Sequence, residues 1–269
     1  MSYLGSLAHG DLGASVITGS SVATDFASRF PATVELALTS LVIAFVLGVP
    51  LGRFSAAHRG SLADVIVTVV SVGGISIPIF VSGLTLQYVF GAQLGLLPTA
   101  GRLDARISLD ARTHFVLIDA LLARRIDVLW DGLRHLALPA LALASIPFAV
   151  FARITRAAVV EASREDHVRV ARSKGLSERT VSSRHIMRNA WLPVVTVVGL
   201  EVGSLLAGAV ITETVFAWPG VGSWVVAAIH NRDYFIVQSS VLIFALIFLA
   251  ANLMVDVAYA YLDPRIRFA

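Results

Sequence analysis

The chain has 269 residues, of which 57% are hydrophobic and only 14% are charged. A soluble domain of this length carries about 25% charged residues, so the deficit indicates that lipid is the solvent for much of the chain. The absence of cysteine excludes a disulfide framework or a thiolate metal site. A net charge of +3 is too small to indicate nucleic-acid binding.

Five long apolar segments predict membrane-spanning helices in an all-α membrane protein. A bilayer core of about 30 Å needs about 20 helical residues, and each segment meets or nearly meets that length. The segments are apolar all round, whereas buried helices of a soluble protein would alternate with polar faces. The predicted spans are Pro31–Gly52, Leu62–Gly91, Leu136–Ile154, Ala190–Phe216 and Val237–Leu262.

The placement of arginines predicts the orientation. Residues 155–190 form a strongly basic loop, and the regions around Arg53 and Arg265 lie on the same side by counting spans. The positive-inside rule places all three, and therefore the C-terminus, in the cytoplasm. Residues 94–134 then form an outer loop, which is long enough for the charge rule to weaken there and to carry short helices of its own.

This orientation places residues 1–30 outside the membrane, although nothing in the sequence would carry them across. We therefore expect a further helix upstream of Met1, which would give six spans in the working protein. An intact mass of the natively expressed protein that matched residues 1–269 would contradict this expectation. The predicted organisation is an extracytoplasmic segment, 1–30, followed by a transmembrane domain, 31–269.

The second predicted span contains a helix break, because Gly73, Gly74, Ser76 and Pro78 follow one another closely. Proline removes a backbone donor and clashes with the preceding turn, and adjacent glycines lower the cost of bending. Lipid tolerates such a break only where protein or a water-filled cavity satisfies the freed carbonyl groups. Ser76 and Pro78 are therefore candidates for lining a translocation pathway, and a kink that serves packing alone is the equal alternative.

The fourth predicted span carries a stripe of small residues, with Gly199, Gly203 and Ala207 at four-residue spacing and Gly208 directly after them. Small residues let helix backbones approach closely in lipid, where no hydrophobic force drives helices together. The stripe therefore predicts a packing face rather than a binding site.

Two glutamates, Glu201 and Glu213, lie in the same span, and Glu35 lies near the outer start of the first one. An acidic group inside a membrane costs several kcal/mol on some scales and marks a candidate functional site. A separation of twelve residues rotates the two by about 120°, so they do not form a paired site. Each is a candidate pathway residue; hydration at the outer end is the alternative for Glu213, and an interfacial position is expected for Glu35.

The basic loop is too polar to span a membrane and too regular to be disordered. A first helix, read from Arg164, places Val168, Ala171 and Arg172 on one side and ends at Gly175. Ser177 is the expected N-cap of a second short helix, Glu178–Asn189. Two short helices would form a compact, exposed knob, and a solvated basic loop that only obeys the charge rule is the alternative.

Eight separated short strings are spread over nearly the whole chain: HGDLG (His9 to Gly13), FPATVELAL (Phe30 to Leu38), GLLPTAGR (Gly95 to Arg102), ARSKGLSER (Ala171 to Arg179), RNAWLPVVT (Arg188 to Thr196), ETVFAWPGVG (Glu213 to Gly222), RDYFIVQ (Arg232 to Gln238) and DPRIR (Asp263 to Arg267). The ordered set resembles the binding-protein-dependent ABC importer permeases, in the branch that handles dipeptides, oligopeptides, nickel and glutathione. Within that branch the chain is most similar to the first, B-type permease of a dipeptide transporter.

The resemblance implies a type I importer permease with six spanning helices, whose first loop helix docks into a groove on a separate ATPase. Ala171 would pack into that cleft, and Arg169, Arg172 and Lys174 would face its rim. The general importer pattern has Glu-Ala-Ala where this chain has Arg169-Val170-Ala171, a departure that resembles the peptide branch. The implied coupling residues are Glu165, Asp166, Arg169, Ala171, Arg172, Lys174 and Gly175.

The resemblance also implies the partners: a second homologous permease, two ATPase subunits or domains, an extracytoplasmic solute-binding protein and membrane lipid. The outer segments, 1–30 and 94–134, and the turn at Trp218 to Gly220 would receive the binding protein. No GxxxxGK motif followed by Ser or Thr occurs in the chain, so we expect ATP and Mg²⁺ on the partner ATPases and no cofactor, metal site or catalytic residue here. The expected location is the bacterial inner membrane.

The sequence thus predicts a non-catalytic permease subunit that imports di- and oligopeptides by alternating access. A nickel or glutathione permease is the alternative within the family, and the lack of a histidine or acidic cluster in the pathway favours peptides. An ion-coupled secondary transporter is the alternative from another class; Glu201 and Glu213 support it, and the basic loop and the lack of inverted repeats oppose it. A membrane scaffold or receptor is disfavoured by the broken, glycine-rich helices.

Overall fold

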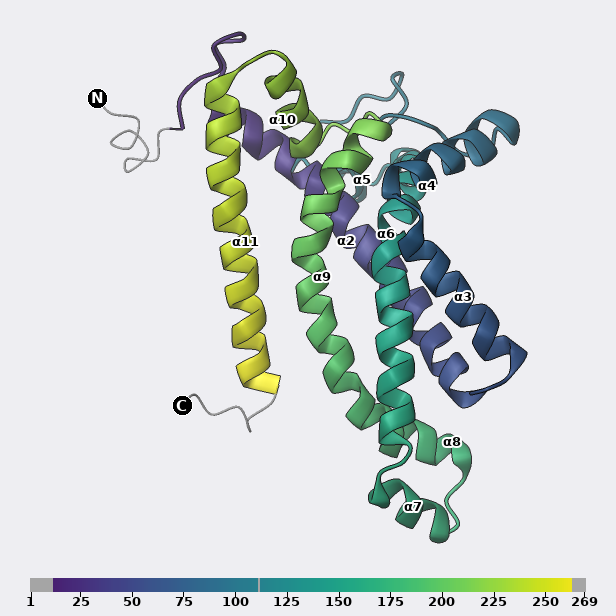
Figure 1. Ribbon diagram of the computed structural model, residues 1–269. Coiled ribbons are helices and arrows are strands. Elements are labelled where there is room, and N and C mark those ends of the chain that lie inside the picture. Colours follow the sequence, from purple (N-terminus) through teal and green to yellow (C-terminus); the bar gives the residue numbers. More distant parts are fainter. Residues whose placement is uncertain (1–11, 111, 263–269) are drawn as a thin grey trace. The chain divides into compact units, whose positions relative to one another are not determined.

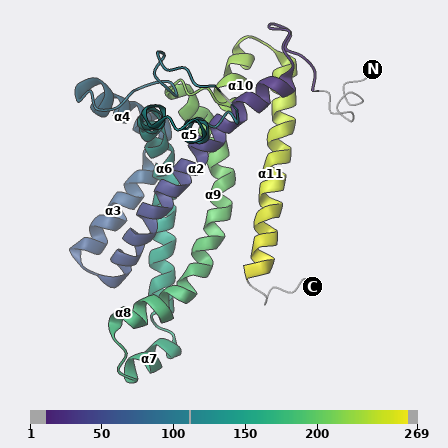
Figure 2. The same ribbon diagram turned by 180° about the vertical axis from the view of Figure 1, so that it is seen from behind.

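The computed structural model describes residues 12–110 and 112–262, and most of these residues lie in helices (Figures 1 and 2). Within them, Ala14 and Ser21 form an isolated antiparallel bridge. The helical elements are α2 (Val22–Ala57), α3 (Leu62–Ser76), α4 (Ile79–Leu86), the π-helix η1 (Gln87–Gln93), α5 (Val116–Leu122), α6 (Ile126–Ala162), α7 (Asp166–Ser173), α8 (Glu178–Thr180), the π-helix η2 (Val181–Ile186), α9 (Met187–Val215), α10 (Val221–His230) and α11 (Tyr234–Leu262).

Three stretches of the described chain are long and apolar enough to cross a membrane: Val22–Ala57, Ile126–Ala162 and Glu178–Val215. They contain almost all of the first, third and fourth predicted spans, so the all-α membrane fold is confirmed. Two of them extend well beyond the prediction at both ends and the third at its start, because hydropathy marks only the part of a helix that suits lipid. The fifth predicted span lies in α11, whose stretch Tyr234–Ala250 is apolar.

The predicted helix break in the second span is confirmed. One helix stops at Ser76 and another begins at Ile79, so the helix is fully interrupted there. Ile77 has an extended backbone, with φ −91° and ψ 121°, because the ring of Pro78 disfavours the helical conformation in the residue before it. The break therefore lies where the sequence places it, but it is complete.

Residue contacts divide the chain into two units. Unit 1 takes its described residues from Met1–Thr39, Ile79–Leu143 and Gly203–Met254, and unit 2 takes its own from Ser40–Pro78, Ala144–Val202 and Val255–Ala269. In unit 1, one apolar cluster joins α10 to the starts of α2 and α11; it contains Val22, Val221, Trp224, Ala228 and Ile236. In unit 2, a cluster from α2, α6 and α9 contains Ala44, Val49, Ala144, Phe151 and Val194.

Small residues set the close approach of helices in both units. In unit 2, a Cβ atom at Gly48 of α2 would lie only 2.8 Å from the Phe148 carbonyl oxygen of α6. In unit 1, a Cβ atom at Gly203 of α9 would lie 3.0 Å from the Phe248 ring, and one at Gly208 would lie 3.2 Å from Leu143. The predicted packing role is confirmed at Gly203 and Gly208, which contact two different helices.

Candidate functional site

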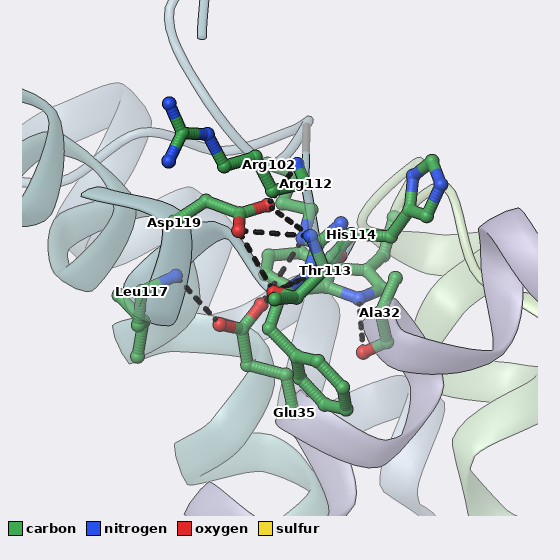
Figure 3. A network of polar contacts seen from close by, with 10 residues as sticks. Ala32, Glu35, Arg102, Arg112, Thr113, His114, Leu117 and Asp119 are labelled. Carbon is green, nitrogen blue, oxygen red and sulfur yellow. Dashed lines mark hydrogen bonds and ion pairs between the residues drawn. The ribbon is translucent and has the colours of Figure 1, made fainter. Parts of the chain in front are cut away.

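Glu35 joins two of the separated sequence strings in unit 1 through a buried ion pair. Its carboxylate accepts hydrogen bonds from Arg102 Nη2 at 2.6 Å and Nε at 3.1 Å, and from the Leu117 backbone amide at 2.9 Å (Figure 3). Arg102 also donates to the His114 carbonyl oxygen at 2.9 Å. Only 7% of Glu35 is exposed, so the loop after η1 is tied to α2 by a paired charge.

Trp218 connects the turn after α9 to the same region of unit 1. Its indole Nε1 donates to the Ala32 carbonyl oxygen at 2.9 Å, and the Arg102 guanidinium lies 5.8 Å from the centre of its ring, within cation–π range. Trp218 and Arg102 each belong to one of the eight strings that carry the family resemblance. The strings therefore meet in space, and we name the assembly of Ala32, Glu35, Arg102, Leu117 and Trp218 the outer network.

Glu213 lies next to the outer network and is completely buried. Its carboxylate accepts hydrogen bonds from Thr33 Oγ1 at 2.6 Å and from the Ser223 amide at 2.9 Å. A side chain at Gly220 would collide with this carboxylate, and one at Gly222 would approach it to 2.9 Å. The expectation that Glu213 is hydrated or lines a pathway is therefore wrong, because its bonds and its burial fix the turn between α9 and α10.

Two further carboxylates close loops in unit 1. Asp119 accepts hydrogen bonds from the amide of Thr113 at 2.9 Å, from its hydroxyl at 2.8 Å and from the Arg112 amide at 3.2 Å (Figure 3). Burial opposes ionisation of the Asp119 carboxyl, but these hydrogen bonds outweigh it and hold its pKa below the ordinary value. Asp233 accepts a hydrogen bond from the Ser15 hydroxyl at 2.5 Å. The predicted outer loop therefore carries its own short helix, α5, and the hydrogen bonds to Asp119 fix the residues directly before that helix.

The basic loop forms a compact knob in unit 2, made of α7, α8 and η2 (Figures 1 and 2). Gly175, at φ +75°, ends α7 in the left-handed conformation that glycine adopts without strain. Ser177 caps α8 by accepting from the Thr180 amide at 3.4 Å. The predictions that Gly175 ends the first loop helix and that Ser177 caps the second are confirmed. The structure therefore favours a structured knob over a solvated loop.

The predicted second loop helix does not end at Asn189. It continues through η2 into α9, so that 178–215 form one helical stretch. The reason is a buried apolar stripe that runs across the expected boundary without a terminating residue. The stripe contains Val181, Ile186, Met187 and Ala190.

The knob packs through an apolar cluster that it shares with α6 and α9, and Ala171 belongs to this cluster. Val168 is 0% exposed and Ala171 4% exposed, and both pack in one cluster with Ala158 of α6 and Met187 of α9. Val168 and Ala171 lie on one side, as predicted. The prediction is wrong for Arg172, which is exposed. The prediction that Ala171 packs into a partner's cleft is wrong, because its side chain faces the chain's own core.

The outward side of α7 is charged, with two apolar side chains set among the charges. Arg172 Nε donates to Glu178 Oε1 at 2.8 Å, and Arg169 lies 3.5 Å from Asp166. Lys174, Glu165 and Gly175 are also exposed.

The two apolar side chains are Val170, 50% exposed, and Leu176, 41% exposed. Neither was predicted from the sequence, although the helical repeat holds the signal for Val170, which follows Val168 by two residues, a rotation of about 200°. Val170 must therefore face away from the core that Val168 occupies.

The remaining pathway candidates have different surroundings. Ser76 is exposed and donates to the Val72 carbonyl oxygen of its own helix at 2.9 Å, and Pro78 is exposed. Glu201 is only 8% exposed, and its Oε2 atom has no hydrogen-bond partner in the described chain. The described residues contain no group of three or more His, Cys, Asp or Glu side chains that could hold a metal ion.

Comparisons with known proteins identify the family. The family model described as "Binding-protein-dependent transport system inner membrane component" matches residues 48–268. The di/tripeptide transport system permease protein DppB of Pseudomonas aeruginosa is 48% identical over 267 residues, covering 99% of this chain and 80% of that protein. The dipeptide permease DppB of Escherichia coli K12 is 41% identical, covering 98% and 79%. The glutathione permease GsiC of Escherichia coli O6:H1 is 39% identical, covering 99% and 78%.

Solved structures show the same fold at low identity. The crystal structure of an amino acid ABC transporter with histidines gives a TM-score of 0.61 at 15% identity, covering 97% of this chain and 99% of that chain. The MetNI methionine ABC transporter in inward-facing conformations gives 0.63 at 12% identity, covering 86% and 93%. The chain belongs to the family of binding-protein-dependent transport system inner membrane components.

Proposed function

We propose that this chain is the transmembrane subunit of an ATP-driven importer that carries di- and oligopeptides and couples to separate ATPase subunits. The observation that carries the proposal is the knob: a small helical structure that exposes Val170 and Leu176 among charged side chains. Apolar side chains surrounded by polar ones are typical of a protein–protein contact. The names of the dipeptide and di/tripeptide relatives support peptides as the substrate class.

The packing of the knob suits a coupling role. The inner side of α7 contacts Ala158 and Ala162 of α6 and Met187 and Ala190 of α9 through one apolar cluster. Displacement of α7 by a partner would therefore act directly on two membrane-spanning helices, since packed apolar side chains move together. The coupling residues we propose are Glu165, Asp166, Arg169, Val170, Arg172, Lys174, Gly175 and Leu176, with Val170 and Leu176 in place of Ala171.

The partners and location follow from the same proposal. ATP and Mg²⁺ would be bound by two ATPase subunits or domains, so that this chain is non-catalytic, and a second permease of the same family would complete the pathway. A solute-binding protein would dock on the loops that the outer network holds in place. The protein would be multi-pass in the bacterial inner membrane with a cytoplasmic C-terminus.

The pathway assignment rests on Glu201, Ser76 and Pro78. Glu201 is the strongest of the three, because a poorly solvated carboxylate with an unpaired oxygen in a spanning helix favours a cationic group, and every peptide with a free N-terminus carries one. Glutathione import is the second candidate, since a glutathione permease is 39% identical to this chain.

A pair of neighbouring substitutions tests the coupling role. Val170→Asp adds charge on the exposed side of α7, so we expect at least a tenfold loss of peptide uptake and of co-purifying ATPase, with normal amounts of folded permease. Ala171→Asp places the same charge in the core of the knob, so the amount of folded protein should fall instead. Val170→Thr, which keeps the shape without a charge, should behave as the wild type. Normal uptake and normal ATPase recovery in Val170→Asp would overturn the proposal.

A further inference from the structure

Unit 2 contains two hollows that have one lining residue, Trp191, in common. The first has a volume of about 920 Å³ and is lined on its polar side by Arg184, His185, Arg188 and His167. The second, of about 610 Å³, is mostly apolar and is lined by Phe45, Val46, Val49, Phe54 and Met187. Trp191 lines both hollows, and the neighbouring residues Ser182 and Ser183 line one each. A basic hollow and an apolar groove are therefore adjacent.

The basic hollow carries positive charge that the described chain leaves uncompensated. Arg184 and Arg188 are exposed, and within the part of the chain that the structure describes no carboxylate lies within ion-pair distance of either. The carboxylate of Glu165 is engaged with His167 Nδ1 at 3.0 Å and with Asn189 Nδ2 at 3.1 Å. Two unpaired guanidinium groups in one hollow are suited to a phosphate group, which accepts their hydrogen bonds in a bidentate manner.

The apolar groove lies on helices that span the membrane. Val46 is 57% exposed and Phe54 45% exposed, both on α2, and the Phe45 and Trp191 rings stack at a centroid distance of 5.9 Å. Arg53 also lines the groove, and its Nη2 donates to Ser182 Oγ at 3.2 Å. Tryptophan and arginine at the end of an apolar segment are typical of the membrane interface. The change from apolar groove to basic hollow thus occurs where lipid headgroups begin.

We propose that these two hollows bind one anionic phospholipid from the leaflet on the side of the basic loop. Its phosphate would lie against Arg184 and Arg188, and one acyl chain would lie along the groove beside Val46 and Phe54 and against Trp191. A soluble phosphate would use only the basic hollow, and a neutral lipid only the groove; an anionic phospholipid satisfies both. Because the site contains residues of α2, α9 and η2, the bound lipid would hold the base of the knob against the bundle. The inference goes beyond peptide import and does not depend on it.

Lipid retention by the purified transporter tests the proposal. The full chain, purified in mild detergent with whatever partners accompany it, is washed with phosphatidylcholine and then offered phosphatidylglycerol, and bound lipid is counted by native mass spectrometry. We expect the wild type to retain phosphatidylglycerol and Arg184→Gln/Arg188→Gln to retain at least fivefold less. The matched control is Arg164→Gln/Arg179→Gln, which removes two exposed arginines of the same loop outside both hollows and should retain lipid as the wild type does.

Two further arms separate the possible occupants. Trp191→Ala should weaken retention although it removes no charge, and soluble glycerol 3-phosphate in excess should not displace the lipid. Equal retention by the two double variants, displacement by glycerol 3-phosphate, or no retained anionic lipid because a partner subunit covers the groove would each overturn the proposal. Peptide uptake is not a readout of this experiment, so its failure is distinguishable from a failure of the proposed function.

Discussion

The outer network of unit 1 and the knob of unit 2 both contain strings that place the chain in its family, yet they are built by opposite physics. In the outer network, polar side chains are buried and paired: Glu35 with Arg102, and Trp218 with the Ala32 carbonyl oxygen. In the knob, apolar side chains such as Val168 are buried, and the charges of Arg172 and Glu178 meet in solvent. Charged and polar side chains thus stabilise the fold in the outer network, whereas in the knob they lie on the surface and contribute little to stability.

This difference separates folding from binding. A buried polar group that loses its partner costs the full penalty of its desolvation, whereas an exposed one is solvated by water. Polar substitutions around Glu35 and Glu213 should therefore act on the fold. Polar substitutions on the outward side of α7 should leave the fold intact, so any effect they have reports on a partner.

The largest effect is expected for Glu213→Leu, which removes the buried acceptor of two hydrogen bonds. Thr33 Oγ1 and the partly buried Ser223 amide would lose their partner, at a cost of about 4 kcal/mol for the two groups. The thermal unfolding midpoint of the purified protein should fall clearly, measured by tryptophan fluorescence in detergent. Glu201→Gln is the control in the same helix, because Glu201 Oε2 has no partner to lose in the described chain. Equal midpoints for the two variants would refute the structural role of Glu213.

A smaller effect, and a direct comparison of the two regions, comes from removing one arginine from each. Arg102→Ala leaves the Glu35 carboxylate buried with only a backbone amide, so we expect a loss of about 3 kcal/mol. Arg172→Ala breaks a pair whose side chains are 44% and 71% exposed, and its unfolding midpoint should equal that of the wild type. Chemical unfolding of both variants measures the difference. If Arg172→Ala were the more destabilised, the contrast between network and knob would be wrong.

The elements that local signals control could be predicted from the sequence. Hydropathy gives the spanning segments, Pro78 gives the position of the helix break, and Gly175 and Ser177 give the end of α7 and the start of α8. Each of these depends on a residue and its immediate neighbours. The length of the last loop helix was missed because a continuous apolar stripe, which only the fold shows to be buried, overrides the expected boundary.

The partners of polar residues could not be predicted, since they come from distant parts of the chain. Glu213 and Thr33 are separated by 180 positions, and Glu35 and Arg102 by 67. An isolated acidic residue in a spanning segment reads the same in sequence whether it is paired, as Glu213 is, or has an unpaired oxygen, as Glu201 has. The burial of Ala171 and the exposure of Val170 were accessible in principle, because the helical repeat fixes their relative directions once one buried residue is known.

The smallest expected effect is a local pH dependence of the loop that Asp119 closes in unit 1, which the amides of α7 in the knob should lack. The hydrogen bonds from Thr113 and Arg112 hold the pKa of Asp119 below its value in the unfolded chain, so the carboxylate stabilises the fold fully at neutral pH. This stabilisation is lost as the pH falls below the ordinary aspartate pKa of about 4 and through the lower pKa of the folded state.

Hydrogen exchange at pH 7 and in the acid range, corrected for the intrinsic rate, should show faster opening of the Thr113 amide in acid. The amides within α7 serve as the internal reference. In Asp119→Asn the acid-induced change at Thr113 should disappear, because the group that titrates is gone. An unchanged acid response in that variant would show that another group controls the loop, and the contrast would then rest on Arg102 and Glu213 alone.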